Sequence, residues 1–262
     1  MLIIGERLNS SNSAVKELLE TRDSEALLAR AGAQLEGGAA WIDVNASMLM
    51  EGEKEALVWA GETILGEFDC GISVDSPDLG ILEHGASVFA EDCIINSLTV
   101  DEEALARMPG MISRGASVIL MLKTSAGIPD DAEGRFELAR RAAEAAEEAG
   151  ADPGRVFLDP VFEPAATSGG LMTALETLWR LRDGMPRHHR IGGLSNVSYG
   201  LPMRRTVNRT FLAMAIASGL DSVICDPTDR RLLDTIAASR ALTGDDSSCR
   251  ELLARYRARK KD

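Results

Sequence analysis

Short apolar runs alternate with longer segments of helical periodicity along the whole chain. The runs are apolar on both faces and do not alternate cleanly, which is typical of parallel strands that are buried on both sides. The eight predicted strands are Leu2–Gly5, Ala40–Val44, Gly71–Val74, Asp92–Ile95, Ser117–Leu122, Arg155–Leu158, Arg190–Leu194 and Ser222–Cys225.

Helical periodicity fills the intervals between the runs, and most of these segments end at a glycine, a common helix stop. The predicted helices cover residues 23–37, 52–66, 78–85, 101–115, 130–150, 169–183, 204–219, 229–243 and 246–259. Strict alternation of strand and helix predicts a parallel sheet with right-handed crossovers. Eight such units within 262 residues favour a closed (β/α)₈ TIM barrel over an open sheet. Composition does not change along the chain, so we expect one domain, residues 1–262.

Composition narrows the choice of partners. Hydrophobic residues make up 45% of the chain, enough for a large core, and the net charge is −13. This acidic balance disfavours nucleic acid as the main partner. The apolar run at the N-terminus is too short for the hydrophobic region of a signal peptide. No stretch of the sequence approaches the roughly 18 consecutive apolar residues that a membrane helix needs. We therefore expect a cytoplasmic protein without a membrane span.

Cysteine and histidine spacing gives no sign of a tightly held metal. The four cysteines form no CxxC pair, and the three histidines form no HxH or HxxxH pair. A tight zinc site is therefore not expected.

A polar residue follows almost every predicted strand, where the active site of such a barrel lies. These residues are Glu6, Asn9, Asp43, Asn45, Asp75, Asn96, Lys123, Asp159, Asn196 and Asp226. No histidine and no nucleophile–base pair falls among them, and no P-loop occurs. A ring of carboxylates and carboxamides suits a flat heterocycle with several N–H donors, such as a pterin.

Two other interpretations of the ring stay open. Any single Asp or Asn after a strand has about even odds of serving only a turn or a helix cap. Asp43, Asp75 and Asp159 together offer oxygen ligands for a weakly bound metal ion, which we rank below the pterin.

Two motifs late in the chain are the most specific ones, LSNVS (194–198) and NRTFLAM (208–214). They resemble motifs of the pterin-binding methyltransferases, most closely the methyltetrahydrofolate:corrinoid protein methyltransferases and the folate domain of cobalamin-dependent methionine synthase, and the resemblance extends over nearly the whole chain. Supporting motifs are MLIIGERLN (1–9), IDVN (42–45), VDS (74–76), INS (95–97) and LDP (158–160).

The resemblance implies a function and a set of site residues. Methyltetrahydrofolate would bind in the barrel mouth and exchange its N5-methyl group with the Co(I) of a corrinoid. By this resemblance Asp75, Asn96 and Asp159 hold the pterin edge, Asn196 is the catalytic carboxamide that hydrogen-bonds near N5, and Arg204 lies near the folate tail. The resemblance also implies a homodimer.

The corrinoid is expected to come from a partner protein, because the chain has no corrinoid-binding DxHxxG motif. Dihydropteroate synthase is the nearest rival, but its Ser-x-Arg-x-His is missing at the last strands, which end in Ser195-Asn196 and Cys225-Asp226. A folate-binding protein without catalysis and a barrel enzyme for an unrelated small molecule also stay open as functions.

Overall fold

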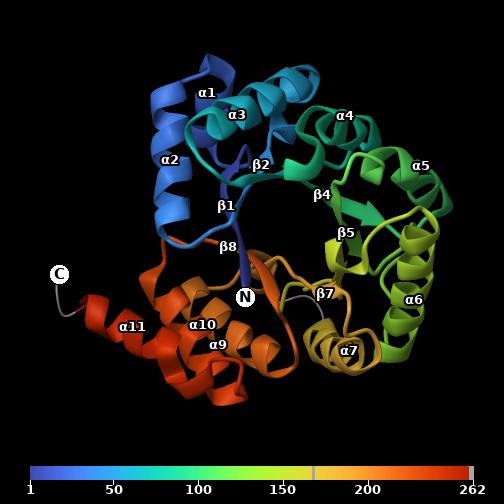
Figure 1. Cartoon of the computed structure of the whole chain (residues 1–262), viewed down its shortest axis with the longest axis vertical. Coiled ribbons are helices and arrows are strands. Elements are labelled where there is room, and N and C mark those ends of the chain that lie inside the picture. Colours follow the sequence, from blue (N-terminus) through green and yellow to red (C-terminus); the bar gives the residue numbers. More distant parts are fainter. Residues whose placement is uncertain (167–168, 260–262) are drawn as a thin grey trace.

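The protein is a barrel of eight parallel strands, as the alternation of the sequence predicts. The computed structural model describes residues 1–166 and 169–259, and Figure 1 shows the strands at the centre of a ring of helices. The strands are β1 (Leu2–Asn9), β2 (Trp41–Asn45), β3 (Gly71–Asp75), β4 (Cys93–Thr99), β5 (Ser117–Met121), β6 (Val156–Asp159), β7 (His189–Arg190) and β8 (Ser222–Cys225). They lie in the order β7-β6-β5-β4-β3-β2-β1-β8. A parallel bridge between Gly193 and Ile224 joins the two ends of this order and closes the barrel.

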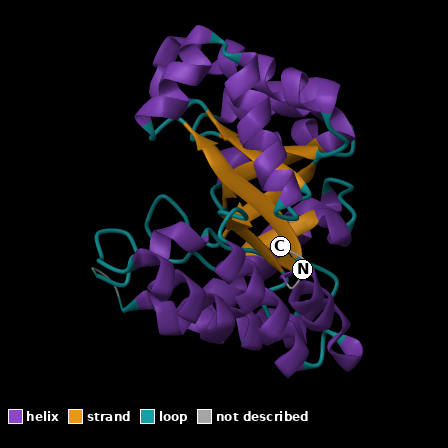
Figure 2. Cartoon of the chain, turned by 90° about the vertical axis from the view of Figure 1, so that its left-hand side faces the viewer, coloured by secondary structure: helices purple, strands orange, loops and turns teal. Residues whose placement is uncertain are grey.

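The helices cover the outside of the strands, which lie between them in Figure 2. They are α1 (Ser13–Thr21), α2 (Ser24–Glu36), α3 (Glu53–Glu67), α4 (Leu79–Phe89), α5 (Glu102–Ile112), α6 (Ala132–Glu148), α7 (Gly170–Gly184), α8 (Leu194–Val197), α9 (Arg204–Ala217), α10 (Arg230–Thr243) and α11 (Arg250–Arg259). Within residues 1–166 and 169–259, no helix is both long and apolar enough to cross a membrane.

Two apolar layers support the barrel. The larger lies between strands and helices, whereas a small cluster of Ile4, Ile94, Ile119, Phe157 and Ile191 fills the barrel interior. Trp41 packs against this cluster from below the mouth. A Cβ on Gly71 would lie 2.1 Å from the Trp41 ring, so the glycine on the neighbouring strand makes room for the indole. This cluster forms a packed floor beneath the mouth of the barrel.

Strands β1 and β4 each extend four residues beyond their predicted ends, and two other local elements differ in kind from the sequence-based prediction. The sequence pattern does not predict helix α1 (Ser13–Thr21), although Asn12 caps it by accepting a hydrogen bond from the Ala14 amide. The seventh strand is shorter than the predicted Arg190–Leu194: β7 ends at Arg190, and Leu194–Val197 form one helical turn. A Cβ on Gly192 would lie 2.2 Å from the Phe162 ring, so close packing of the loop after β6 holds this glycine segment.

Candidate active site

A cavity of about 510 Å³ opens at the C-terminal ends of the strands. All five predicted site residues line it: Asp75, Asn96, Asp159, Asn196 and Arg204. Glu6, Arg7, Asp43, Met121, Ser195 and Tyr199 are among its other lining residues. The structure therefore brings the predicted residues into one cavity, and their roles toward a ligand remain predictions.

The floor of the cavity on the β2–β4 side is a hydrogen-bonded set of buried polar groups. Asp43 is buried and accepts hydrogen bonds from the Ser73 hydroxyl at 2.6 Å and from the Asn96 carboxamide nitrogen at 3.0 Å. Because Nδ2 of Asn96 is used by Asp43, its Oδ1 is the atom left to accept from a ligand. Burial raises the pKa of Asp43 to about 6, against the opposing effect of these hydrogen bonds.

Asp75 lies beside Asp43 and shares a hydrogen bond with it. Burial and the negative charge of Asp43 raise the pKa of Asp75 well above its usual range, whereas a hydrogen bond with Asn45 opposes the shift. Two adjacent buried carboxyl groups cannot both ionise readily, so this arrangement favours a proton shared between them over two negative charges.

Asp159 stands at the end of β6, apart from that pair. It accepts a hydrogen bond from the Val161 amide at 2.8 Å, and burial raises its pKa to about 6 although Arg135 and Lys123 oppose the shift. With a pKa of about 6, the carboxyl group is mostly ionised at pH 7. It is the clearest charged acceptor in the floor for N–H donors of a ligand.

A buried arginine fixes the loop that follows Asp159. Arg135 of α6 donates to the carbonyl oxygens of Pro129, Pro160 and Val161 at 3.0, 2.6 and 3.2 Å. Its remaining nitrogen pairs with Glu163 at 2.9 Å, and its side chain is only 2% exposed. The Arg135 guanidinium thus holds the β6–α7 loop in place, and this loop in turn positions Asp159.

Glu6 enters the cavity from a bulge in β1. The β1–β2 register shifts between Gly5 and Leu8, and the freed Arg7 amide donates to Gln34 Oε1 at 2.8 Å. The half-buried Glu6 carboxylate accepts a hydrogen bond from the Ser195 hydroxyl. Burial raises the pKa of Glu6 to about 7, so this carboxyl group titrates near neutral pH.

Asn196 lies on the helical turn α8, across the cavity from the polar groups of β2–β4. Its carboxamide is exposed and makes no hydrogen bond with any residue that the structure describes. A Cβ on Gly193 would approach Asn196 Nδ2 to 3.0 Å, so the glycine lets the carboxamide lie close to the backbone. Among the predicted amides, Asn96 is engaged and Asn196 is available to a ligand.

Arg204 connects α9 to α8. Its guanidinium donates to the Ser198 hydroxyl and to the Ser195 carbonyl oxygen, each at 3.0 Å. These bonds hold the turn that carries Asn196, so Arg204 has a supporting contact in addition to its predicted place near a ligand tail.

Other residues of the predicted ring have different positions. Lys123 lines an adjoining cavity of about 680 Å³, while Met121 at the end of β5 faces both cavities. Asp226 accepts from the amide and hydroxyl of Thr228 at 3.0 and 2.6 Å, as the turn interpretation of such residues predicts. Among the described residues, no group of three or more His, Cys, Asp or Glu side chains could hold a metal ion.

Glu6, Asp43 and Ser195 are cavity residues that the predicted site left out. Glu6 and Asp43 belong to the ring of polar strand ends, but nothing in the sequence reveals the bulge or the shared hydrogen bonds that give them shifted pKa values. Ser195 adjoins Asn196, and its contact with Glu6 joins residues from opposite ends of the chain.

Together these features define a TIM barrel whose mouth contains carboxyl groups, carboxamides and an arginine around one cavity. A family model described as pterin binding enzyme matches residues 5–226. The chain belongs to this family.

Curated relatives agree with that assignment. The chain is 31% identical over 261 residues to a methylcorrinoid:tetrahydrofolate methyltransferase of Eubacterium limosum, covering 98% of this chain and 96% of that protein. It is 27% identical over 240 residues to methionine synthase of Mycobacterium leprae, covering 86% of this chain but only 20% of that much longer protein.

Solved structures show the same fold. A dihydropteroate synthase from Xanthomonas albilineans in complex with 7,8-dihydropteroate has a TM-score of 0.70 and 20% identity, and covers 92% of each chain. The Yersinia pestis dihydropteroate synthase has a TM-score of 0.67 and 18% identity, and covers 93% of each chain.

Proposed function

We propose that the protein is a methyltransferase that moves a methyl group between N5 of methyltetrahydrofolate and a corrinoid carried by a separate protein. The observation that carries this proposal is the cavity that joins an ionised Asp159 and an engaged Asn96 to the available carboxamide of Asn196. The similarity over 98% of the chain to a methylcorrinoid:tetrahydrofolate methyltransferase supports the same reaction.

The pterin is held through its amidine edge. Its ring N–H and amino donors face Asp159 and the Asp43–Asp75 pair, while Oδ1 of Asn96 accepts one further hydrogen bond. Met121 gives an apolar contact to the flat ring. Because burial raises the pKa values of the adjacent carboxyl groups Asp43 and Asp75, binding of N–H donors of the amidine edge favours the ionised form of the pair.

The chemical step needs a hydrogen-bond donor at N5. The methyl group leaves without its bonding electron pair, which stays on N5, and a proton then occupies that nitrogen. The reduced corrinoid supplies the electron pair that accepts the methyl group. Nδ2 of Asn196 can donate to N5 as electron density develops there, without carrying a charge of its own.

Glu6 is the proton store for this step. Its pKa of about 7 provides both the protonated and the ionised form at neutral pH, and its partner Ser195 adjoins Asn196 in sequence. A proton can pass between Glu6 and N5 through the Ser195 hydroxyl or through water. The same group accepts the proton when methyl transfer runs toward methyltetrahydrofolate.

The partner protein docks on the loops around the mouth. Four large apolar side chains there are strongly exposed: Met48 at 51%, Met50 at 78%, Tyr199 at 70% and Met203 at 73%. They lie in the segments after β2 and after α8, and Tyr199 also lines the cavity. Adaptable methionines and an aromatic ring suit a transient protein interface next to the reacting site.

We further propose a homodimer in the cytoplasm. Trp179 on α7 is 56% exposed, with the Arg182 guanidinium over its ring at 5.7 Å, and offers one apolar contact for a second copy. Sedimentation of the purified protein tests the dimer, and fractionation of cells tests the location.

The reaction itself is tested with free cobalamin. The protein is mixed anaerobically with methyltetrahydrofolate and cob(I)alamin, and methylcobalamin is followed by its absorbance. Enzyme-dependent formation of methylcobalamin is expected. Folate binding without transfer would mean a carrier, and no folate binding would exclude the pterin interpretation. Formation of dihydropteroate from a pterin pyrophosphate and p-aminobenzoate would instead assign the dihydropteroate synthase activity.

A further inference from the structure

A second cavity, rich in arginine, lies beside the candidate active site and has no part in the reaction described above. It measures about 500 Å³ and lies between the start of α9, the end of β8 and the start of α10. Its lining residues are Arg205, Arg209, Asp226, Thr228, Asp229, Arg230 and Arg231. Four arginines in one cavity are unexpected in a chain with a net charge of −13.

The aspartates of this cavity are already engaged. Asp229 caps α10 by accepting from the amides of Arg231 and Leu232 at 3.0 and 3.3 Å. Asp226 accepts from Thr228 and pairs with Arg7 at 3.5 Å. In the described part of the chain, no ion pair joins either carboxylate to Arg205, Arg209 or Arg231.

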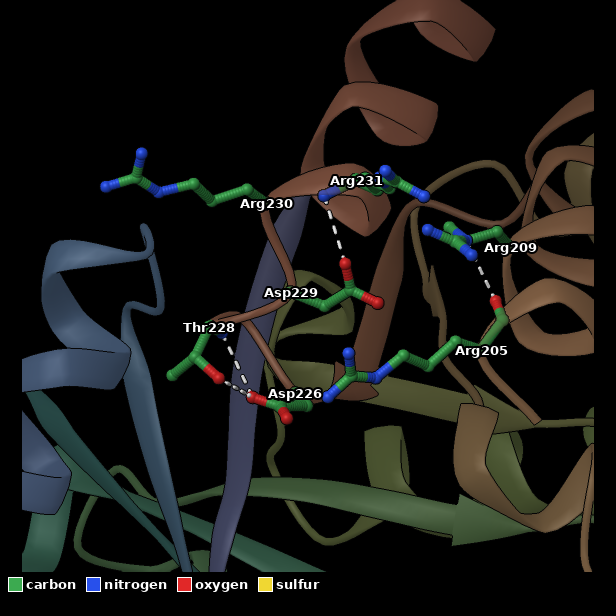
Figure 3. Close-up of a pocket in the computed structure, with 7 residues that line it drawn as sticks. All are labelled: Arg205, Arg209, Asp226, Thr228, Asp229, Arg230 and Arg231. Atoms are coloured by element: carbon green, nitrogen blue, oxygen red, sulfur yellow. Dashed lines mark hydrogen bonds between the residues drawn. The ribbon is translucent and has the colours of Figure 1, made fainter. Parts of the chain in front are cut away.

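Three of the guanidinium groups are therefore available to pair with an anionic ligand. Arg205, Arg209 and Arg231 make no ion pair with any residue in the ranges 1–166 and 169–259. Figure 3 shows their side chains directed toward a common space, with Arg209 and Arg231 facing each other, whereas Arg230 extends away. Three guanidinium groups beside only two carboxylates, both already engaged in capping or turn contacts, favour an anionic ligand with more than one negative group.

The arginine cavity adjoins the candidate active site at two points. Arg204 lines the active-site cavity and the next residue, Arg205, lines the arginine cavity. The ion pair between Arg7 and Asp226 joins the walls of the two cavities on the other side. A ligand that fills the barrel mouth and extends past α8 reaches the arginines.

The proposed substrate extends in this direction. In a folate the tail is attached at C6, the ring atom next to N5, on the edge opposite the amidine. If the amidine edge faces the carboxyl groups of β3 and β6 and N5 faces Asn196, the tail leaves the mouth on the β7–β8 side. That side carries Arg204 and then the arginine cavity.

We propose that this cavity binds the γ-linked glutamates that extend the folate tail, through carboxylate contacts with Arg205, Arg209 and Arg231. This inference rests on the proposed function, because it needs a folate in the mouth. Each added γ-glutamate brings one carboxylate on a flexible chain, which matches separate guanidinium groups around a concave site. A folded acidic partner protein fits less well, since its surface cannot enter a cavity of about 500 Å³ as a flexible chain does.

The test compares methyltetrahydrofolate with one and with three glutamates as ligands of the full chain. We expect the wild-type protein to bind the triglutamate about 10-fold more tightly at low salt, an advantage that falls as ionic strength rises. Arg205→Gln with Arg231→Gln removes most of the advantage and leaves monoglutamate affinity within about 2-fold. Both side chains are exposed, so the fold tolerates the change.

The matched control is Arg140→Gln with Arg141→Gln on α6, which changes the net charge equally on another side of the barrel (Figure 1). It should keep the triglutamate advantage. Equal affinity of the wild-type protein for both folates would overturn the inference and leave the proposed function intact, because the monoglutamate still binds. Two results with the arginine variant would also overturn the inference. One is an equal loss of affinity for the monoglutamate and the triglutamate. The other is slower methyl transfer to a corrinoid protein while the triglutamate still binds more tightly than the monoglutamate. Failure to bind either folate would remove the proposed function as well.

Discussion

The two halves of the barrel mouth are built differently. On the β2–β6 side, acidic groups are buried or half-buried, bonded to one another or to the backbone, and hold raised pKa values, as Asp43 and Asp159 do. On the β7–β8 side, Asn196 and Arg204 are exposed, and the arginine cavity begins beyond them. A rigid acidic floor suits recognition of a fixed heterocycle, whereas the exposed side suits chemistry at N5 and the passage of a tail and a partner.

The rigidity of the acidic half depends most on Arg135, so its replacement should have the largest effect. Arg135→Met leaves the Pro160 and Val161 carbonyl groups and Glu163 without their donor. We expect a loss of about 3–5 kcal/mol in the free energy of unfolding, because the buried Pro160 carbonyl group and the half-buried Glu163 carboxylate lose their donor. Urea unfolding measures it, with Arg140→Met on the exposed face of the same helix as a control that should change stability by less than about 0.5 kcal/mol. Equal stability of the Arg135→Met and Arg140→Met variants would mean that the loop after β6 keeps its conformation without the hydrogen bonds from Arg135.

Asp159→Asn tests recognition by the acidic half. The substitution keeps the shape but replaces the charged acceptor, so folate binding should weaken by about 1.5–3 kcal/mol. The rate at saturating folate should change little. Calorimetric titration and single-turnover kinetics measure the two quantities, and unchanged affinity would count against the pterin-edge assignment.

Glu6 links the halves, and its protonation should appear in the pH profile. Transfer from methyltetrahydrofolate needs the protonated form, so the rate should fall as the pH rises through about 7, and Glu6→Gln should lack this limb. A pH profile of single-turnover rates measures it. A limb that persists in the variant would assign the titration to another group.

Stability gives an independent check of the same pKa. The carboxyl pKa of Glu6 is raised from 4.5 to about 7 by folding, so ionisation costs stability increasingly between these values and fully above pH 7. We expect Glu6→Gln to raise the free energy of unfolding by about 1–2 kcal/mol at pH 8 and by little at pH 4.5. The same gain at both values would show that the effect is not electrostatic.

Substitution of an exposed apolar residue at the rim of the β7–β8 side should have the smallest effect on methyl transfer. Met203→Ser removes an apolar side chain that is 73% exposed, so it should slow transfer with a corrinoid protein by about 3–10-fold and leave transfer with free cobalamin unchanged. Met172→Ser, 65% exposed on α7, is the matched control. An equal loss with free cobalamin would place Met203 in the site rather than in the interface.

The sequence predicts the barrel and the polar strand ends because both follow from short-range patterns. Buried runs followed by Asp75, Asn96 or Asp159 are visible residue by residue. The one-turn helix under Asn196 is not visible, because its apolar residues continue the pattern of a strand and only closure through Gly193 and Ile224 ends that strand early.

Contacts between distant segments set the remaining features of the site. The Glu6–Ser195 hydrogen bond and the use of Arg135 by the loop after β6 depend on tertiary packing. The arginine cavity likewise combines residues of α9 and α10 that no spacing rule relates. The polar residues that follow the strands can therefore be predicted from the sequence, and their charge states cannot.

The most direct test of the account is the effect of Asn196→Ala on the two steps measured separately. Single-turnover methyl transfer to cob(I)alamin should slow by about 10²–10³-fold, because a donor placed at N5 is lost. The folate dissociation constant should stay within about 3-fold, since the acidic half still holds the pterin. Equal losses in rate and affinity, or no loss in rate, would contradict the division of the mouth into a half that binds and a half that carries out the transfer.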